Sequence, residues 1–291
     1  MKLIHYIDTS YEVGSFGGVP RFDNELKKIL DIKTFIRLQK NMMLSQLERD
    51  DIVITDNGMC TEIPDGVKCI VVHHGCSKTH QEREPLWNGQ YYVNSQNRMS
   101  KRKNTYFVAP SIFMQREFKR HYDIEGTLIP HYSGLNPSEL PVKSRKVLGD
   151  WRGFNKGESV IPLLQERGNF EYIQLDCGMT EESKMEAYAQ ASIYLTLSLC
   201  EGCSYSQLDA LACGLPVLST DVSLFGGDCD NTCGHFISWE ARDNLDLIEK
   251  RLTDIYDNYH LYNPRKWVDD NVSLRHWKNR WEDLIERVKN D

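Results

Sequence analysis

Short apolar runs alternate with longer amphipathic segments along the whole chain. The apolar runs have the length and composition of buried strands and lie at 2–7, 34–38, 51–56, 68–75, 105–111, 170–175, 193–199 and 217–218. Helical spacing of apolar residues predicts helices at 19–30, 44–47, 112–121, 180–191, 205–213, 244–256 and 272–288. Ser111 and Thr180 are the expected N-caps of the helices at 112–121 and 180–191. Strands that alternate with helices from end to end predict an α/β fold with parallel sheets.

The segment that follows the apolar run 193–199 carries the clearest signal. Ser204 is a suitable N-cap for a short helix, and Gly214 suits the left-handed position that ends it. Glu201 and Asp209 lie eight positions apart across the turn, at the carboxyl end of a strand, where open α/β sheets bind ligands. Helix amides can hold a phosphate, and a carboxylate can accept hydrogen bonds from sugar hydroxyls. The alternative interpretation is a capped helix with two solvated acids.

This segment resembles the donor-binding motif of GT-B glycosyltransferases of the retaining, family-4 type. That motif has a Glu, seven residues and a second Glu, followed by Ala-x-Ala-x-Gly-x-Pro-Val. Glu201 matches the first Glu, residues 210–217 match the tail, and Asp209 stands in place of the second Glu. The resemblance implies that Glu201 contacts the donor sugar and that Asp209 holds the nucleotide ribose. It also implies that the turn at Cys203, Ser204 and Tyr205 binds the donor.

Further pieces of the chain match the same family. Val147 to Gly157 resembles its Gly-Arg…Lys-Gly segment, with three residues between Arg152 and Lys156 instead of the usual four. The resemblance implies that these two cations neutralise the donor diphosphate, which would stabilise the leaving nucleotide electrostatically. Without the family resemblance they are two cations on a loop, and either interpretation is open.

In the first half of the chain, the family places a Gly-Gly pair against the donor diphosphate, and here Gly17 and Gly18 stand between a strand and a helix. Arg21 follows at the helix start as a candidate contact to the acceptor. The run 68–75 ends near two histidines, where the family has a histidine beside the donor sugar. We expect His73 to take that catalytic position and His74 to bind the acceptor.

The resemblance implies the GT-B fold, with two Rossmann-like domains facing a cleft. We expect an N-terminal acceptor domain at 1–135, a C-terminal donor domain at 143–270, and a helix at 271–291 that packs back on the first domain. The length of 291 residues suits two such domains.

Composition narrows the class of protein. No apolar run approaches the roughly 20 residues that a transmembrane helix needs, and nothing at the start resembles a signal peptide. The odd number of cysteines, nine, favours free thiols in a reducing compartment, so we expect a cytoplasmic location. Cys200 and Cys203 have the spacing of a metal or redox pair, but no second pair repeats it. We expect no metal and no cofactor besides a nucleotide-diphosphate sugar as co-substrate.

The sequence therefore predicts a hexosyl- or pentosyltransferase that moves a sugar from a nucleotide sugar to an acceptor hydroxyl, with retention. The acceptor class (glycan, small molecule or modified DNA) stays open. One alternative is a phage-type enzyme that glycosylates a hydroxylated DNA base, supported by the basic residues Arg98, Lys101, Arg102 and Lys103 beside aromatic residues. A nucleotide-sugar epimerase or hydrolase of the same fold, and a non-catalytic sugar-binding relic, also stay open.

Overall fold

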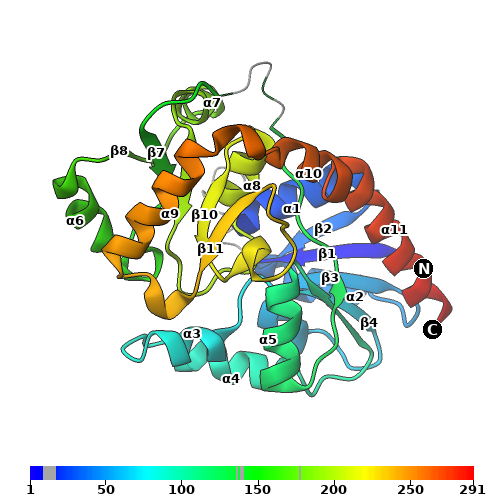
Figure 1. Cartoon of the computed structure of the whole chain (residues 1–291). Helices are drawn as coiled ribbons and strands as arrows, with labels where there is room; N and C mark the ends of the chain where they lie inside the picture. The colour runs from blue at the N-terminus through cyan, green and yellow to red at the C-terminus, as the bar shows by residue number, and fades with distance from the viewer. Residues whose placement is uncertain (9–17, 136, 138–140, 177) are drawn as a thin grey trace. The chain divides into compact units, whose positions relative to one another are not determined.

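The computed structural model describes residues 1–8, 18–135, 137, 141–176 and 178–291 (Figure 1). The chain forms two compact units. The first contains Met1–Pro130 together with Lys278–Asp291, and the second contains His131–Trp277. The expected limits 1–135, 143–270 and 271–291 stay a prediction about independently folding domains.

The first unit is built on a six-stranded parallel sheet with the order β2-β1-β3-β4-β5-β6. Its strands are β1 (Leu3–Ile7), β2 (Lys33–Ile36), β3 (Ile52–Asp56), β4 (Lys68–Val72), β5 (Thr105–Ala109) and β6 (Thr127–Leu128). The strand order reverses between β1 and β3, which makes the carboxyl ends of these strands a natural place for a ligand.

The helices of the first unit are α1 (Gly18–Ile29), α2 (Lys40–Gln46), α3 (Ser77–Arg83), α4 (Gln90–Met99) and α5 (Ile112–Tyr122), with 3₁₀ turns η2 (Arg37–Gln39) and η3 (Asn57–Glu62). The predicted cap of α5 is confirmed, because Ser111 Oγ accepts a hydrogen bond from Met114 N at 3.2 Å. The end of the last helix, α11 (Leu274–Asn290), belongs to this unit, and Trp281 packs 6.1 Å from Phe22 of α1, ring centre to ring centre.

The second unit contains a five-stranded parallel sheet with the order β11-β10-β9-β7-β8. Its strands are β7 (Lys146–Gly149), β8 (Glu171–Gln174), β9 (Ile193–Thr196), β10 (Val217–Thr220) and β11 (Gly234–Ile237). The order reverses between β7 and β9, so the loops that leave these two strands diverge and open a space for a ligand.

The helices of the second unit are α6 (Val160–Arg167), α7 (Glu181–Gln190), α8 (Tyr205–Ala212), α9 (Leu245–Asp257) and α10 (Pro264–Asn271). The 3₁₀ turns are η4 (Phe154–Lys156), η5 (Ser223–Gly226), η6 (Trp239–Ala241) and η7 (Tyr259–Leu261). The predicted N-cap of α7 is confirmed, since Thr180 Oγ1 accepts from Ser183 N at 3.1 Å.

Helices cover both faces of the second sheet. Leu148, Tyr194 and Val217 pack into one core with α7, α8 and α10, whereas their neighbours Val147 and Leu218 pack into another core with α6 and α9. This is the period-2 alternation of a strand buried on both sides, and it explains the continuous apolar runs in the sequence.

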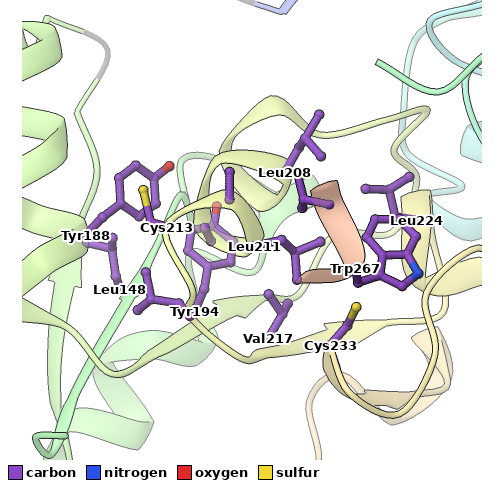
Figure 2. Close-up of a cluster of buried hydrophobic side chains, with 14 of the residues drawn as sticks. Leu148, Tyr188, Tyr194, Leu208, Leu211, Cys213, Val217, Leu224, Cys233 and Trp267 are labelled. Carbon is purple, nitrogen blue, oxygen red and sulfur yellow. The ribbon is translucent and has the colours of Figure 1, made fainter. Parts of the chain in front are cut away.

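Helix α8 lies inside the first of these cores (Figure 2). Leu208 and Leu211 are fully buried and share this cluster with Trp267 of α10. The helix ends as predicted, because Gly214 has φ +86° and Leu215 N donates to Ala210 O at 2.9 Å. Since burial of a Leu side chain contributes about 1.5–3 kcal/mol, packing holds this short helix in place.

One sequence expectation needs correction, and two segments of the chain had no assignment. The strand predicted at 193–199 ends at Thr196, and the rest of the apolar run is buried loop. Helix α10 had no prediction, although Asn263 caps it by accepting from Lys266 N at 3.3 Å and Pro264 is its first residue. The segment 80–103, which had no assignment, contains most of α3 and all of α4.

Candidate active site

The candidate site of the second unit lies where the loops after β7 and β9 diverge. Asp150 follows β7 directly, and Lys156 ends η4 in the same loop. Glu201 lies between β9 and α8. Both loops therefore start at the point where the strand order reverses, as expected for a ligand site in an open α/β sheet.

A charged cluster joins these loops. Asp150 Oδ1 lies 2.7 Å from Arg152 Nε, and Asp150 Oδ2 lies 2.8 Å from Lys156 Nζ. Lys156 Nζ also lies 3.4 Å from Glu201 Oε1. The structure thus brings Arg152, Lys156 and Glu201 together and adds the buried carboxylate of Asp150, which the sequence analysis missed. Its place directly after a strand was the only signal for it.

The charges of the cluster hold one another ionised. The carboxylate of Glu201, followed by that of Asp150, raises the pKa of Lys156 although burial opposes the shift. Burial alone would raise the pKa of Asp150, but the hydrogen bonds and charges of Arg152 and Lys156 outweigh it and lower that pKa. Both cations therefore stay charged at neutral pH, and the site offers two fixed positive groups to which a phosphate can bind.

Backbone contacts fix the turn that carries Lys156. Leu199 N donates to Asn155 O at 2.8 Å, which ties the turn to the segment before Glu201. Gly157 has φ +87°, and a Cβ there would lie 2.7 Å from Leu197 Cβ, so only glycine fits.

A buried arginine holds the same turn from the other side. Arg242, 3 % exposed, donates from Nη1 to Phe154 O at 3.0 Å, and its guanidinium lies 4.6 Å from the centre of the Phe154 ring. This residue follows η6 and had no prediction. It satisfies a backbone carbonyl of η4 and thereby positions the turn.

The turn between Glu201 and α8 is held by Ser223 of η5. Ser204 N donates to Ser223 Oγ at 3.0 Å, and Ser223 N donates to Glu201 O at 3.2 Å. Ser204 occupies the N-cap position of α8 as expected, but its side chain makes no capping hydrogen bond. The predicted cap interaction is therefore wrong, because Ser204 Oγ lies 3.1 Å from Ser206 Oγ instead.

The remaining expected donor residues are largely buried. Cys203 belongs to the core around α8, and the Tyr205 ring stacks on His131 with ring centres 4.9 Å apart. Asp209 is 4 % exposed, and its Oδ1 accepts a hydrogen bond from Ser133 Oγ at 2.7 Å. A ribose hydroxyl that binds Asp209 would therefore share or replace the Ser133 hydroxyl.

The two histidines of the first unit lie in different surroundings. His73 is fully buried, and its ring stacks on Phe118 and Phe107 with centres 3.6 and 5.2 Å away. Burial, followed by the charge of His74, lowers the pKa of His73 to about 3. A ring packed in this way offers no group to a substrate, so the geometry favours a structural role for His73. The catalytic role of His73 stays a prediction that this geometry does not support.

His74 belongs to a polar cluster at the carboxyl ends of the first sheet's strands. Its Nε2 lies 2.7 Å from Asp56 Oδ1, and its ring meets Phe22 edge-on. Nearby, His5 Nε2 lies 3.1 Å from Asp23 Oδ1, both fully buried. Burial, followed by the charge of Asp56, raises the pKa of Asp23 to about 6. No sequence pattern linked these four residues.

Two other expected residues are at the start of α1. Gly18 is the first residue of the helix, and Arg21 Nε lies 2.9 Å from Glu25 Oε1. Gly17 lies outside the described residues.

The basic residues near 98–103 do not act alike. Arg102 Nη2 donates to Pro64 O at 2.8 Å and to Val67 O at 2.9 Å, so it serves the fold of the first unit. Arg98, Lys101 and Lys103 are exposed.

Among the residues that the structure describes, no metal-binding cluster lies beside the candidate site. Within the described ranges, no group of three or more His, Cys, Asp or Glu is arranged to hold a metal ion. The cysteines that the structure describes are free thiols, as predicted, Cys200 and Cys203 among them. None of the described helices has the length and apolar character to cross a bilayer.

No protein-family model and no curated protein sequence matches this chain. Solved structures do match. Sucrose-phosphate synthase from Thermosynechococcus elongatus has a TM-score of 0.74 at 12% identity, and the match covers 99% of each chain. WaaG, a glycosyltransferase involved in lipopolysaccharide biosynthesis, has a TM-score of 0.67 at 16% identity, over 97% of this chain and 99% of its own.

The pneumococcal O-GlcNAc transferase GtfA, solved with UDP and GlcNAc, has a TM-score of 0.63 at 18% identity over 87% of this chain. This chain spans only 60% of the length of GtfA. Together the matches show that the chain has the GT-B fold with two Rossmann-like units, and the predicted resemblance to GT-B glycosyltransferases is confirmed at the level of fold.

Proposed function

We propose that this protein is a glycosyltransferase that moves a hexosyl or pentosyl group from a nucleoside-diphosphate sugar to an acceptor hydroxyl, with retention and without a metal ion. The observation that carries the proposal is the cluster of Arg152, Lys156 and Glu201 around Asp150, at the point where the second sheet reverses its strand order. Fixed cations beside a carboxylate suit a ligand that joins a diphosphate to a sugar.

Arg152 and Lys156 bind the diphosphate in this proposal. The ion pair of Arg152 with Asp150 uses Nε, which leaves the two terminal nitrogens of the guanidinium for phosphate oxygens. Lys156 donates to the same group and stabilises the negative charge that develops as the nucleotide leaves. Asp150 does not touch the ligand, and it acts by holding both cations in position.

The turn before α8 binds the sugar and the ribose. Glu201 accepts hydrogen bonds from sugar hydroxyls, and the backbone of Cys203, Ser204 and Tyr205 lines the donor at the helix start. Asp209 accepts from the ribose in exchange for Ser133. In the first unit we propose that Gly17 and Gly18 approach the diphosphate and that Arg21 and His74 bind the acceptor.

A melting experiment tests the donor site. The protein is heated with UDP, GDP, ADP or CDP, with and without EDTA, and a ligand at a hundred times its Kd stabilises the fold by about 2.7 kcal/mol. We expect one nucleotide to raise the melting temperature in the presence of EDTA, and we expect Lys156→Ala and Glu201→Ala to lose the shift. Lys184→Ala and Glu186→Ala on α7 are matched controls that keep it. A chain that responds to no nucleotide, or variants that respond like the wild type, would refute the proposal.

A reaction assay separates the related activities. With the nucleotide sugar identified by melting, release of nucleoside diphosphate is measured without acceptor, with glycans and with DNA that carries a hydroxymethylated base. Turnover that needs an acceptor supports a transferase, and the anomeric configuration of the product, read by NMR, tests retention. Release or isomerisation at full rate without acceptor would identify a hydrolase or epimerase.

A further inference from the structure

The loop between α3 and α4 presents an unusual apolar surface. Leu86 is 97% exposed, and Tyr91 and Tyr92 at the start of α4 are 65% and 58% exposed. Single exposed apolar residues are ordinary on protein surfaces, but three large ones within seven positions form a patch of the kind that marks an interaction site. Figure 1 shows α3 and α4, in cyan, beside α5.

The patch is preformed. Trp87 stacks on His80 with ring centres 4.3 Å apart and lies 6.0 Å from Tyr92, which Tyr91 meets edge-on. A Cβ at Gly89 would lie 2.0 Å from the Trp87 ring, so the backbone of the loop also packs on the indole. These contacts order the loop and leave the Leu86 side chain outside them.

Positive charge lies next to the patch. Between positions 77 and 104 the chain has six Lys or Arg and two Glu, a local charge of +4 in a chain with a net charge of −7. Tyr91 and Arg98 are seven positions apart on α4, so they share one face about 10 Å apart. Arg98, Lys101 and Lys103 are exposed, and their side chains form no ion pair with any residue that the structure describes.

We propose that Leu86, Tyr91 and Tyr92, with Arg98, Lys101 and Lys103, form an anchor that binds the protein to the surface of an anionic lipid bilayer. Leucine and tyrosine side chains enter the headgroup region, where aromatic residues with polar tips are favoured. The three cations bind lipid phosphates at the same surface. Leu86 precedes α4, and Lys101 and Lys103 follow it, so the anchor lies along the membrane interface and does not cross the bilayer.

Nucleic acid suits the same surface less well. Stacking of bases needs open aromatic faces, whereas Trp87, the largest ring of the loop, is already stacked on His80 and packed against Gly89. Arg102, the fourth cation of the run, is occupied by the carbonyls of Pro64 and Val67. An exposed leucine contributes nothing to a phosphate backbone but is expected at a lipid interface.

Flotation with vesicles tests the anchor. The full chain is mixed with vesicles of phosphatidylcholine alone or of phosphatidylcholine with phosphatidylglycerol at three to one. We expect binding to the anionic vesicles and at least tenfold weaker binding to the neutral ones, since each cation contributes about fivefold. We expect Leu86→Ser with Tyr91→Ser, and separately Arg98→Gln with Lys101→Gln and Lys103→Gln, each to weaken binding at least tenfold.

Matched controls are Leu261→Ser, at a side chain 62% exposed in the second unit, and the triple change Lys28→Gln, Lys250→Gln, Lys278→Gln. Melting with nucleotide shows whether every variant is folded and keeps its donor site, so failure of the anchor is separable from failure of the proposed activity. No binding to anionic vesicles, or equal losses in the controls, would overturn the proposal. So would salt-sensitive binding of a single-stranded oligonucleotide that the α4 variants alone lose.

Discussion

Asp150 Oδ2 lies 2.8 Å from Lys156 Nζ, and the other oxygen of the same carboxylate holds Arg152. One buried acid thus orders both cations of the proposed diphosphate site. Its negative charge also offsets one of the two positive charges. Asp150 therefore weakens the attraction for an anionic ligand while it holds Arg152 and Lys156 in the positions that bind it.

We predict that Asp150→Asn separates these effects. Loss of one negative charge raises the affinity for a nucleoside diphosphate about fivefold at low salt, whereas turnover falls because Lys156 and Arg152 are no longer held. Calorimetry with the nucleotide found by melting gives the affinity, and steady-state kinetics give kcat. Asp257→Asn, at an exposed position at the end of α9, is the control. A loss of affinity together with turnover would show that Asp150 only supports the fold.

Arg242 provides a second test of positioning. We predict that Arg242→Met lowers stability by about 2–3 kcal/mol, because it leaves carbonyls of η4 without their donor. Nucleotide affinity falls as well, since Lys156 ends the same turn. Arg242→Lys keeps the positive charge but loses the stacking on Phe154, so we expect its stability and its nucleotide affinity to lie between those of Arg242→Met and the wild type. Urea unfolding and calorimetry measure the two effects, with Arg251→Met as control. Lost stability at unchanged affinity would contradict the positioning role.

The buried His73 predicts loss of stability in acid. Its folded-state pKa of about 3 lies below the value of 6.5 in the unfolded chain. The unfolded state therefore gains a proton that the folded state does not as pH falls below 6.5, and stability drops by about 1.4 kcal/mol per pH unit down to about pH 3. His73→Phe, which keeps an aromatic ring against Phe118, removes this loss, about 2 kcal/mol at pH 5. Urea midpoints at pH 5 and 7.5 measure it, and an equal loss in the variant would refute the assignment.

Asp23 predicts the opposite slope. Its folded-state pKa of about 6 lies above the value of 3.8 in the unfolded chain. The folded state holds the extra proton between these values, so stability decreases as pH rises from about 4 to 6. Asp23→Asn abolishes this decrease. The variant is best compared in the His73→Phe background, where the histidine slope is absent, and a decrease that persists there would contradict the prediction.

Local chemistry explains what the sequence predicted well. Ser111 and Thr180 cap their helices through side-chain oxygens, and Gly214 ends α8 in the left-handed region, since these effects depend only on neighbouring residues. The motif around Glu201 likewise combined a buried strand, a turn and a helix at fixed spacing.

Other features depend on contacts between distant segments. Asp150 has no spacing signature, and its role follows only from two cations that fold onto it. Adjacent histidines after a strand cannot be told apart by sequence, because the end of β4 at Val72 and the stacking on Phe118 decide which ring is buried. The apolar run after Thr196 exceeded its strand because the loop itself enters the core. Helix α10 was predictable from Asn263 and Pro264, a capping residue followed by proline.

The discontinuous make-up of the first unit has a consequence for biosynthesis. Its core includes Trp281, which packs near Phe22 although more than 250 positions separate the two residues. The second unit, His131–Trp277, is a single stretch, and all of its residues leave the ribosome before Lys278–Asp291 of the first unit. During translation the second unit can therefore complete its core first. Met1–Pro130 is made earlier but cannot complete its core until the end of α11 is made, and until then its apolar surface is accessible to chaperones.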